Sequence, residues 1–312
     1  MNIQFDSNDI KIYKSDNIEL LKSLPDNSVN LIYCDILYNS GKKFDDYDDD
    51  LGTPHEAIEW YRPRIKEMHR VLSKNGTILI HCNWRIDSYI RVLLDEIFGF
   101  YNFRNRIYRK HSETRGFVNN VDSQVDVILY YVKNRHDFVF NEILGDKLNI
   151  FPLFENGTSE ERSYNFNYKD ITFNPLEHGK HWLIPIHELK KLCDKDEVVF
   201  IDGYPYRKTY AIPIGNLWDE ECMLDSFSRT DIEEGYDTPK PLKALERIIR
   251  MFSNPGDTVA DFFMGGGTTV IETFKNGRKG IFCDISEKAC KVTIKKLINE
   301  INKLIVKENK DE

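Results

Sequence analysis

Three consecutive glycines, Gly265 to Gly267, stand between an apolar run that ends at Asp261 and a helix-like segment that begins at Thr268. Glycines in a strand-to-helix turn adopt positive φ and let the backbone approach a ligand closely, and the first N–H groups of the helix lack intrahelical acceptors. The sequence therefore predicts a cofactor-binding loop, although a glycine turn in an α/β domain without a ligand gives the same pattern.

The charges around the glycines narrow the choice of cofactor. A further apolar run ends at Asp284, and a carboxylate at the tip of the second strand of a βαβ unit can accept two hydrogen bonds from a ribose diol. The glycines do not follow the dinucleotide pattern G-x-G-x-x-G, and Asp261 would repel a pyrophosphate. A carboxylate there suits a cationic amino group, which indicates S-adenosylmethionine with its amino-acid and sulfonium ends.

A second candidate site, Asp35 to Tyr38, follows the apolar run 29–34. In a doubly wound sheet, ligands bind beyond the carboxyl ends of the strands. Asp35 offers a carboxylate acceptor and Tyr38 a flat face for stacking, which is what chemistry on the exocyclic amine of a flipped-out nucleobase requires. For this tetrapeptide alone, an aspartate that caps the next turn and a tyrosine that packs over the sheet are an equal alternative.

A parallel sheet would bring these residues together, and the apolar pattern predicts one. Strand-like and helix-like segments alternate, and near-continuous apolar runs are typical of central parallel strands, so the fold class is α/β. The expected strands are 10–13, 29–34, 77–82, 125–132 and 280–283. The expected helices are 18–24 after a cap at Ser15 or Asp16, 54–72 closed by Asn75-Gly76, 87–98 closed by Gly99, 242–252, and one from Ser286 onward.

The alternation breaks down between residues 134 and 235. This stretch contains scattered prolines, two tryptophans and short strands such as 197–201. We interpret 134–235 as a separate mixed module inserted into an α/β domain that is formed by 1–133 and 236–312.

Basic residues gather just before the expected strand 125–132. They are Arg104, Arg106, Arg109, Lys110, His111 and Arg115, interleaved with Phe103, Tyr108 and Phe117. Basic and aromatic residues mixed in a loop can follow a phosphate backbone and fill stacking gaps, whereas a solvated loop is the plainer interpretation. The acidic segment 44–51 is not expected to face phosphates.

Composition sets broader limits. With 312 residues, of which 41% are hydrophobic, the chain can bury a sizeable core. Its net charge of −8 argues weakly against a nucleic-acid partner, but binding depends on how charge is distributed locally. No leader pattern or membrane-length apolar run occurs, and the six cysteines form no C-x-x-C pair, so we expect free thiols, a cytoplasmic location and no metal site.

Together these motifs resemble the amino-methylating DNA methyltransferases of the beta class. The resemblance rests on Asp35 to Tyr38, on the helix entry Thr238 to Pro241 and on the loop Asp261 to Thr269. In that family the catalytic tetrapeptide precedes the cofactor loop. The resemblance implies a Rossmann-like S-adenosylmethionine-dependent methyltransferase sheet with circularly permuted motif order, and it makes 134–235 a target-recognition module.

This sequence departs from the family pattern at several positions. The tetrapeptide is usually Asp-Pro-Pro-Tyr and the loop resembles Asp-Pro-Phe-x-Gly-Ser-Gly-Thr-Thr. Ile36 and Leu37 replace both prolines of the tetrapeptide, Phe262 replaces the proline of the loop, and Gly266 replaces its serine. Without the prolines φ is less restricted, so a looser loop is expected.

The resemblance implies roles for individual residues. Asp35, helped by the carbonyl of Ile36, accepts the amine hydrogens, and Tyr38 stacks on the base. The cofactor residues are Asp16, Asn17, Asp35, Lys240, Asp261, Phe263, Gly265, Gly267, Thr268, Thr269 and Asp284. In the context of this family, the basic cluster predicts that Arg104, Arg106, Arg109, Lys110 and Arg115 contact double-stranded DNA.

The substrate and partners stay partly open at this stage. An aspartate at the first tetrapeptide position favours adenine N6, since relatives that methylate cytosine N4 mostly carry serine there. Cytosine N4, RNA or a protein amide as substrate, and a methyltransferase-like protein that only binds DNA or cofactor, are the alternatives. The resemblance also leaves open a restriction endonuclease partner and a homodimer.

Overall fold

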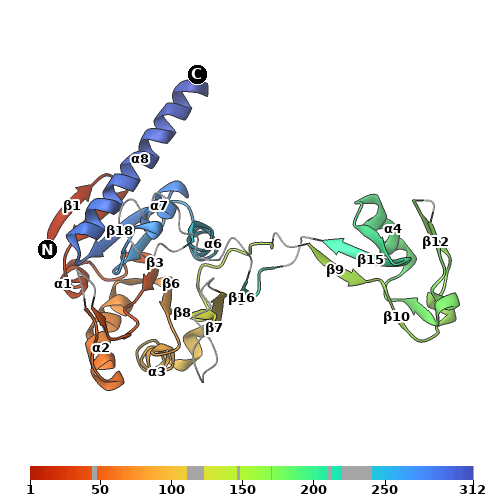
Figure 1. Cartoon of the computed structure of the whole chain (residues 1–312), viewed down its shortest axis with the longest axis horizontal. Helices are drawn as coiled ribbons and strands as arrows, with labels where there is room; N and C mark the ends of the chain where they lie inside the picture. Colours follow the sequence, from red (N-terminus) through yellow and green to blue (C-terminus); the bar gives the residue numbers. More distant parts are fainter. Residues whose placement is uncertain are drawn as a thin grey trace. The chain divides into compact units, whose positions relative to one another are not determined.

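The chain folds as two compact units, one large and one small (Figure 1). The first comprises Met1–Asn141 and Gly215–Glu312, and the second Glu142–Ile214. The structure, a computed structural model, describes residues 1–43, 48–110, 123–145, 148–169, 171–209, 213–219 and 241–311.

The first unit is built on a sheet that has nine strands within the described residues. Its central strands β2, β18, β17, β3 and β6 are parallel, whereas β8 runs antiparallel to both neighbours and β1 antiparallel to β2. In spatial order the strands are β1 (Asn2–Asp6), β2 (Ile10–Lys14), β18 (Lys279–Asp284), β17 (Thr258–Asp261), β3 (Val29–Asp35), β6 (Leu72–Cys82), β8 (Val125–Val132), β7 (Phe103–Lys110) and β16 (Leu217–Trp218). This is the expected α/β sheet.

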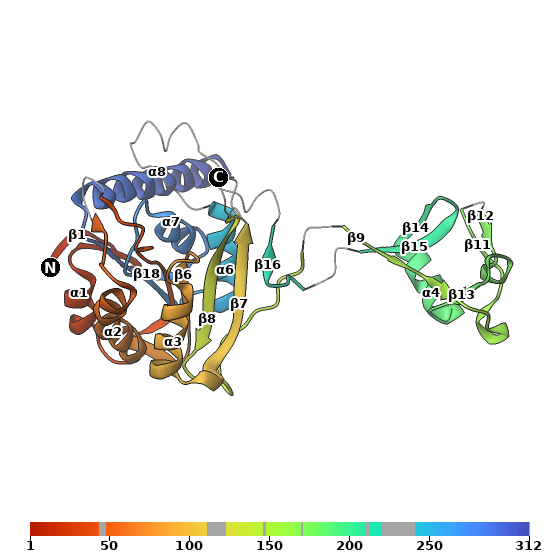
Figure 2. The same ribbon diagram turned by 60° about the horizontal axis from the view of Figure 1, so that its bottom comes forward.

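Helices cover both faces of this sheet (Figure 2). One layer contains α1 (Asn17–Ser23), α2 (Pro54–Val71) and α3 (Asp87–Phe98), and the other α6 (Leu242–Phe252), α7 (Thr268–Lys275) and α8 (Glu287–Asp311). The chain leaves β3 through α2 toward β6, and it leaves β17 through α7 in the opposite direction, toward β18. The neighbours β17 and β3 are therefore the switch point of the sheet, where ligands bind in doubly wound folds.

Local sequence explains where several helices begin and end. The Asp16 side chain accepts a hydrogen bond from the Ile18 N–H and caps α1, and Thr53 and Glu56 form a capping box at the start of α2. Helix α2 ends at Val71 rather than at Asn75-Gly76, because Leu72 is extended and already begins β6. Helix α3 spans the predicted residues and is followed by Gly99 at φ 89°.

The described part of the segment expected to be a loop is a strand, contrary to the expectation, and residues 111–122 lie outside the described residues. Residues Phe103–Lys110 form β7, which pairs with β8 on one side and β16 on the other. Ile107 and Arg109 are buried and alternate with Tyr108 and Lys110, which are not. Apolar periodicity did not predict this strand, because several residues of β7 are charged.

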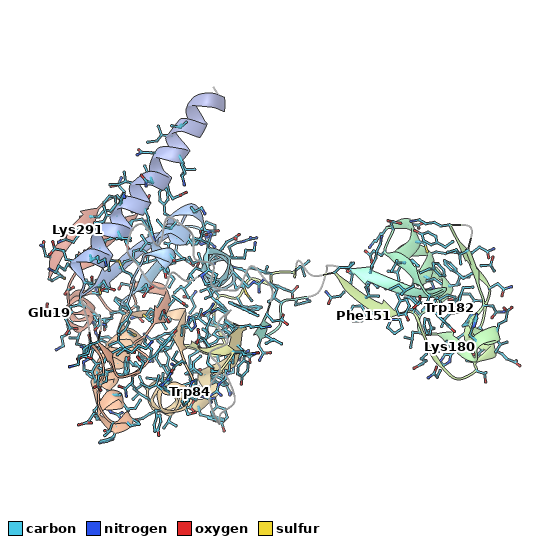
Figure 3. The ribbon with its side chains drawn as sticks, in the orientation of Figure 1. Glu19, Trp84, Phe151, Lys180, Trp182 and Lys291 are labelled. Carbon is cyan, nitrogen blue, oxygen red and sulfur yellow. The ribbon has the colours of Figure 1, made fainter. Side chains whose placement is uncertain are left out.

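The second unit has its own small core (Figure 3). Leu153, Phe166, Phe173, Leu189 and Val198 pack with Trp182, whose indole N–H donates to the Tyr164 carbonyl. Its elements are β9 (Asn149–Pro152), β10 (Phe154–Asn156), β11 (Phe166–Tyr168), β12 (Ile171–Phe173), β13 (Lys180–Trp182), α4 (Ile186–Asp194), β14 (Val198–Ile201) and β15 (Tyr204–Thr209).

This unit is narrower than the predicted module 134–235. Residues 134–141 and 215–219 belong to the first unit. Asn141, for example, donates through its side-chain amide to the carbonyls of Arg250 in the last turn of α6 and of Ser253 just after it. Among the described residues, no helix combines the length and the apolar character needed to cross a bilayer.

Candidate functional site

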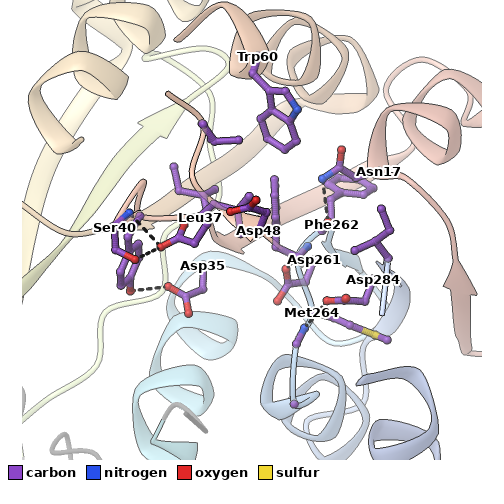
Figure 4. Close-up of a pocket in the computed structure, with 18 of the residues that line it drawn as sticks. Asn17, Asp35, Leu37, Ser40, Asp48, Trp60, Asp261, Phe262, Met264 and Asp284 are labelled. Carbon is purple, nitrogen blue, oxygen red and sulfur yellow. Dashed lines mark hydrogen bonds between the residues drawn. The ribbon is translucent and has the colours of Figure 1, made fainter. Parts of the chain in front are cut away.

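A pocket of about 610 Å³ opens at the carboxyl ends of β17 and β3 (Figure 4). It brings together most of the residues predicted for catalysis and cofactor binding, although they come from both ends of the chain. Those in its wall are Asp16, Asn17, Asp35, Ile36, Tyr38, Asp261, Phe263, Gly265, Thr268, Thr269 and Asp284. Gly267 is not in the wall, and Lys240 lies outside the described residues.

Asp261 is one of the residues that line the pocket, and only 1% of its surface is exposed. Its carboxylate accepts hydrogen bonds from the Thr269 hydroxyl at 2.7 Å and from the Phe263 N–H at 3.0 Å. Burial raises the pKa of Asp261 to about 7, while these two hydrogen bonds act in the opposite direction. The group can therefore change charge near neutral pH when a cation approaches.

The glycine turn has the predicted backbone. Gly265 and Gly267 have positive φ values of 49° and 78°. A Cβ atom on Gly267 would lie 2.4 Å from the Thr293 side chain, so this glycine lets the turn pack against α8. The Gly265 N–H donates to Asp284 at 3.0 Å, and the other oxygen of Asp284 accepts from the Ser286 N–H at 2.8 Å.

One wall of the pocket contains residues that the sequence analysis missed. Trp60 lies at the upper end of the pocket in Figure 4, and its ring centroid is 6.3 Å from that of Phe263. The guanidinium of Arg64 stacks 3.4 Å from the Trp60 ring centroid and also bonds Asp16 at 3.1 Å and Asn17 at 2.7 Å. One pattern in the sequence could have identified this pair. Trp60 and Arg64 are one helical turn apart on α2, and Trp60 lies outside the apolar face of that helix.

The other end of the pocket is formed by the tetrapeptide after β3. Asp35 is partly exposed, and it accepts a hydrogen bond from the Tyr38 hydroxyl at 2.7 Å. Burial and the nearby Asp35 charge raise the pKa of Tyr38 well above its ordinary value, so the hydroxyl stays protonated and donates. The Ile36 N–H donates to the His81 carbonyl, which ties the tetrapeptide to β6.

The loop after the tetrapeptide is held by an aspartate of the acidic segment 44–51. Buried Asp49 accepts hydrogen bonds from the N–H groups of Asn39 at 3.0 Å and Ser40 at 3.1 Å, and from the Ser40 hydroxyl. It lies in β5 (Asp48–Asp49), which pairs with β4 (Lys42–Lys43). These bonds fix the backbone directly after Tyr38, in a chain whose tetrapeptide lacks the two prolines of the family pattern.

The predicted DNA-binding residues do not form one cluster. Lys110 is exposed at the carboxyl end of β7, Arg106 is 3.5 Å from Asp87, and exposed Arg104 stacks on Phe138 at the amino end. Arg115 lies outside the described residues.

Arg109 must be removed from the predicted DNA-binding set. Only 1% of its surface is exposed, and its guanidinium bonds Asp126 on the adjacent strand at 2.8 Å. A residue buried in this way cannot reach a phosphate backbone at the surface.

The edge of the pocket carries two further residues that the sequence analysis did not single out. Asn83 and Arg85, which follow β6, line the pocket. Between them Trp84 is 54% exposed, and the Arg85 guanidinium lies 4.6 Å from its ring centroid. An exposed aromatic ring beside a cation at the pocket edge can contact both bases and phosphates.

This geometry can position two ligands against each other. One half of the pocket offers carboxylates, glycine backbone and an aromatic wall to a cationic, ring-bearing molecule. The other half offers the partly exposed carboxylate of Asp35 beside Tyr38 to an amine. Bringing reacting groups together in this way supplies a large part of the acceleration of a group transfer.

Most of the chain matches a known family. A family described as DNA methylase matches residues 29–296. The type II methyltransferase M.EcaI of Enterobacter cloacae is 29% identical over 293 residues, which cover 85% of this chain and 64% of that protein. The DNA adenine methyltransferase YhdJ of Escherichia coli K12 is 28% identical over 294 residues, 92% of this chain and 82% of that protein.

Solved structures share the fold. The PvuII DNA methyltransferase, described as cytosine-N4-specific, has a TM-score of 0.57 at 15% identity over 94% of this chain and 88% of that chain. A protein of Thermus thermophilus described as a putative DNA modification methylase, solved with S-adenosylmethionine, has a TM-score of 0.52 at 18% identity over 93% of both chains. At these identities the likeness concerns the fold alone.

Proposed function

The chain belongs to the DNA methylase family, and on that premise we propose that it transfers the methyl group of S-adenosylmethionine to the exocyclic amine of a flipped base in double-stranded DNA. The observation that carries this proposal is the meeting of Asp35 and Tyr38 with the Asp261 to Thr269 loop in one pocket. The two motifs are far apart in sequence, and neighbouring strands bring them together.

The cofactor half of the pocket fits S-adenosylmethionine. Asp261 faces the cationic amino group, and Asp284 faces the ribose diol. Trp60 faces the adenine ring, and the Arg64 guanidinium stacks on Trp60. The positive φ of Gly265 lets the backbone pass close to the ligand. When bound, the sulfonium supplies an already activated methyl group, so this chain needs only to place the acceptor in line.

The target half places the amine. Asp35 accepts the amine hydrogens, so that the nitrogen lone pair turns out of the ring plane and toward the methyl group. Tyr38 stacks on the base while its hydroxyl holds one oxygen of Asp35. With the cofactor bound, the amine nitrogen held by Asp35 would gain the methyl group as the sulfur–methyl bond breaks, and it would give one proton to water.

Adenine N6 is the proposed target atom. A carboxylate is a stronger acceptor than the hydroxyl that serine would provide, and a purine gives Tyr38 a larger face to stack on than cytosine does. The relative YhdJ is described as an adenine methyltransferase. The fold does not distinguish adenine N6 from cytosine N4 as the target, since the PvuII enzyme, which shares the fold, is described as cytosine-N4-specific.

The DNA surface is proposed to combine two kinds of contact. Lys110, Arg106 and Arg85, with Trp84, contact the duplex near the pocket, whereas the Glu142–Ile214 unit reads the sequence. On the same premise we expect a cognate restriction endonuclease, and a second copy of the chain, among its partners.

Nucleoside mass spectrometry after incubation with S-adenosylmethionine and duplex DNA tests the function. We expect N6-methyladenine in DNA from the wild type and none with Asp35→Ala. N4-methylcytosine as the main product would overturn the target base. Transfer to RNA or protein but not to DNA would overturn the substrate class, and cofactor binding without any transfer would indicate a protein that only binds.

A further inference from the structure

From Asp35 on β3, a row of neighbouring side chains extends across the next three strands of the sheet, which are β6, β8 and β7. His81 Nδ1 on β6 is 3.7 Å from Asp35 Oδ1, and His81 Nε2 is 3.4 Å from Asp126 Oδ2 on β8. Asp126 Oδ2 in turn accepts from Arg109 on β7 at 2.8 Å. His81 and Arg109 are each 1% exposed, so solvent barely screens these charges.

The contacts of His81 indicate which ring nitrogen carries the proton. Tyr33 on β3 lies with its hydroxyl 2.8 Å from His81 Nδ1. Burial raises the pKa of Tyr33 well above its ordinary value, so its hydroxyl keeps its proton and donates to Nδ1. The neutral ring then carries its proton on Nε2, which faces Asp126, and the positive charge of Arg109 offsets that of Asp126.

We propose that His81 is a positioning residue that acts through Asp35. In the neutral ring Nδ1 accepts from Tyr33 and does not donate to Asp35, so Tyr38 holds Asp35 Oδ1 and the carboxylate keeps its orientation toward the amine of the target base. This inference rests on the proposed function, because it assigns Asp35 the role of amine acceptor. It also explains why Arg109 is buried, since Arg109 stabilises Asp126, the carboxylate next to His81 Nε2.

The same geometry makes the site sensitive to the charge of His81. Within the described part of the chain, the groups that face it include Asp35, Tyr38 and Tyr33 from β3 and its loop, Asp126 from β8 and, through Asp126, Arg109 from β7. A protonated ring would place a positive charge between two carboxylates. Asp35 would then be drawn toward His81 and would accept less strongly from the amine. The neutral ring is the active form, and activity falls as His81 gains a proton.

His81→Gln is the direct test, because glutamine has a similar reach and cannot titrate. We expect the single-turnover rate of methyl transfer to fall about 10- to 100-fold, the size of effect that a misplaced reacting group produces. The acid limb of the rate profile should flatten, while S-adenosylmethionine affinity stays unchanged. The matched control is His69→Gln on α2, where the ring packs against Phe98 at 4.7 Å and is remote from the pocket.

Two further variants keep the inference testable if His81→Gln does not fold. Tyr33→Phe removes only the hydroxyl on Nδ1, and Asp126→Asn removes only the charge on Nε2. Each should change the pH dependence of single turnover, whereas Tyr33→Phe should leave the folded state and cofactor binding intact. These readouts separate positioning from a merely structural role.

The outcomes also separate this inference from the proposed function. Wild-type methyl transfer to DNA with an unchanged rate and pH profile in folded His81→Gln or Tyr33→Phe would overturn the role of His81 alone. Absence of wild-type transfer to DNA would overturn the proposed function first.

Discussion

The ends of β3 and β17 carry the same residue in different surroundings. Asp35 is partly exposed beside Tyr38, whereas Asp261 is 1% exposed and its oxygens accept from Thr269 and Phe263. The two strands are neighbours and both aspartates line one pocket. A strand-end aspartate therefore identifies a ligand edge, but its neighbours decide what it does there.

The difference assigns the two carboxylates to different ligands. A partly exposed carboxylate can accept hydrogen bonds from a base that enters from solvent. A buried carboxylate with a raised pKa gains most from a cation that is bound next to it and neutralises it. We therefore expect changes at Asp35 to affect methyl transfer and changes at Asp261 to affect cofactor binding.

Replacing Asp35 should give the largest effect. Asp35→Asn keeps the size of the side chain but weakens the acceptor, so the single-turnover rate should fall about 10²- to 10⁴-fold. Cofactor affinity should not change. Asp50→Asn, at an exposed aspartate that also lines the pocket, is the matched control and should remain active. Equal losses in both variants would mean that general pocket charge matters rather than the place of Asp35.

Replacing Asp261 should give the reverse pattern. Asp261→Asn should weaken S-adenosylmethionine binding by about 1.5–3 kcal/mol, the usual contribution of a hydrogen bond to a charged group. Rates at saturating cofactor should change little. Calorimetric titration measures the affinity, and Asp257→Asn just before β17, where the carboxylate bonds the Asn254 N–H, serves as control. Unchanged S-adenosylmethionine affinity in Asp261→Asn would contradict the assignment of Asp261 to the cofactor and Asp35 to the target base.

The pKa of Asp261 adds a pH dependence to this comparison. A bound cation lowers that pKa, so cofactor binding near pH 6 to 7 should release a proton, and affinity should rise by at most about tenfold per pH unit up to about pH 7. Titrations in buffers of different ionisation enthalpy detect the proton, and Asp261→Asn should release none.

Protein stability should show the opposite trend. The pKa of Asp261 is higher in the folded protein than in the unfolded chain, so the folded state holds the proton more tightly. This contribution to the free energy of unfolding is therefore lost as pH rises between about 4 and about 7. Thermal unfolding of the cofactor-free wild type and of Asp261→Asn across this range checks it.

The strand ends could be predicted from the sequence because they follow a simple rule. Apolar runs become central parallel strands, and the polar residue that stops each run lies at the ligand edge. This rule located Asp35, Asp261 and Asp284, and all three line the pocket. It needs no knowledge of side-chain contacts.

Other features depend on contacts that no local pattern encodes. Arg109 resembled a DNA-binding arginine because it stands among other basic residues, but its partner Asp126 becomes adjacent only when β7 and β8 pair. Arg64 and Asp49 likewise act through residues that are distant in sequence or in an irregular loop. The narrower second unit also follows from packing, since the Asn141 side chain donates to carbonyls at the carboxyl end of α6.

The smallest expected effect concerns DNA affinity and extends the comparison to the two ends of β7. Lys110 is exposed at the carboxyl end of the strand, near the ligand edge, and Arg104 is exposed at the amino end, roughly 20 Å away at the rise of a strand. Since phosphate contacts release counterions, Lys110→Ala should lower the salt slope of DNA binding by about 0.9 and weaken all duplexes alike. Arg104→Ala should leave the slope nearly unchanged. Fluorescence anisotropy with several duplexes over a range of salt concentrations measures both. A change in preferred sequence with Lys110→Ala, or an equal loss in both variants, would show that the DNA does not lie along the carboxyl edge of this sheet.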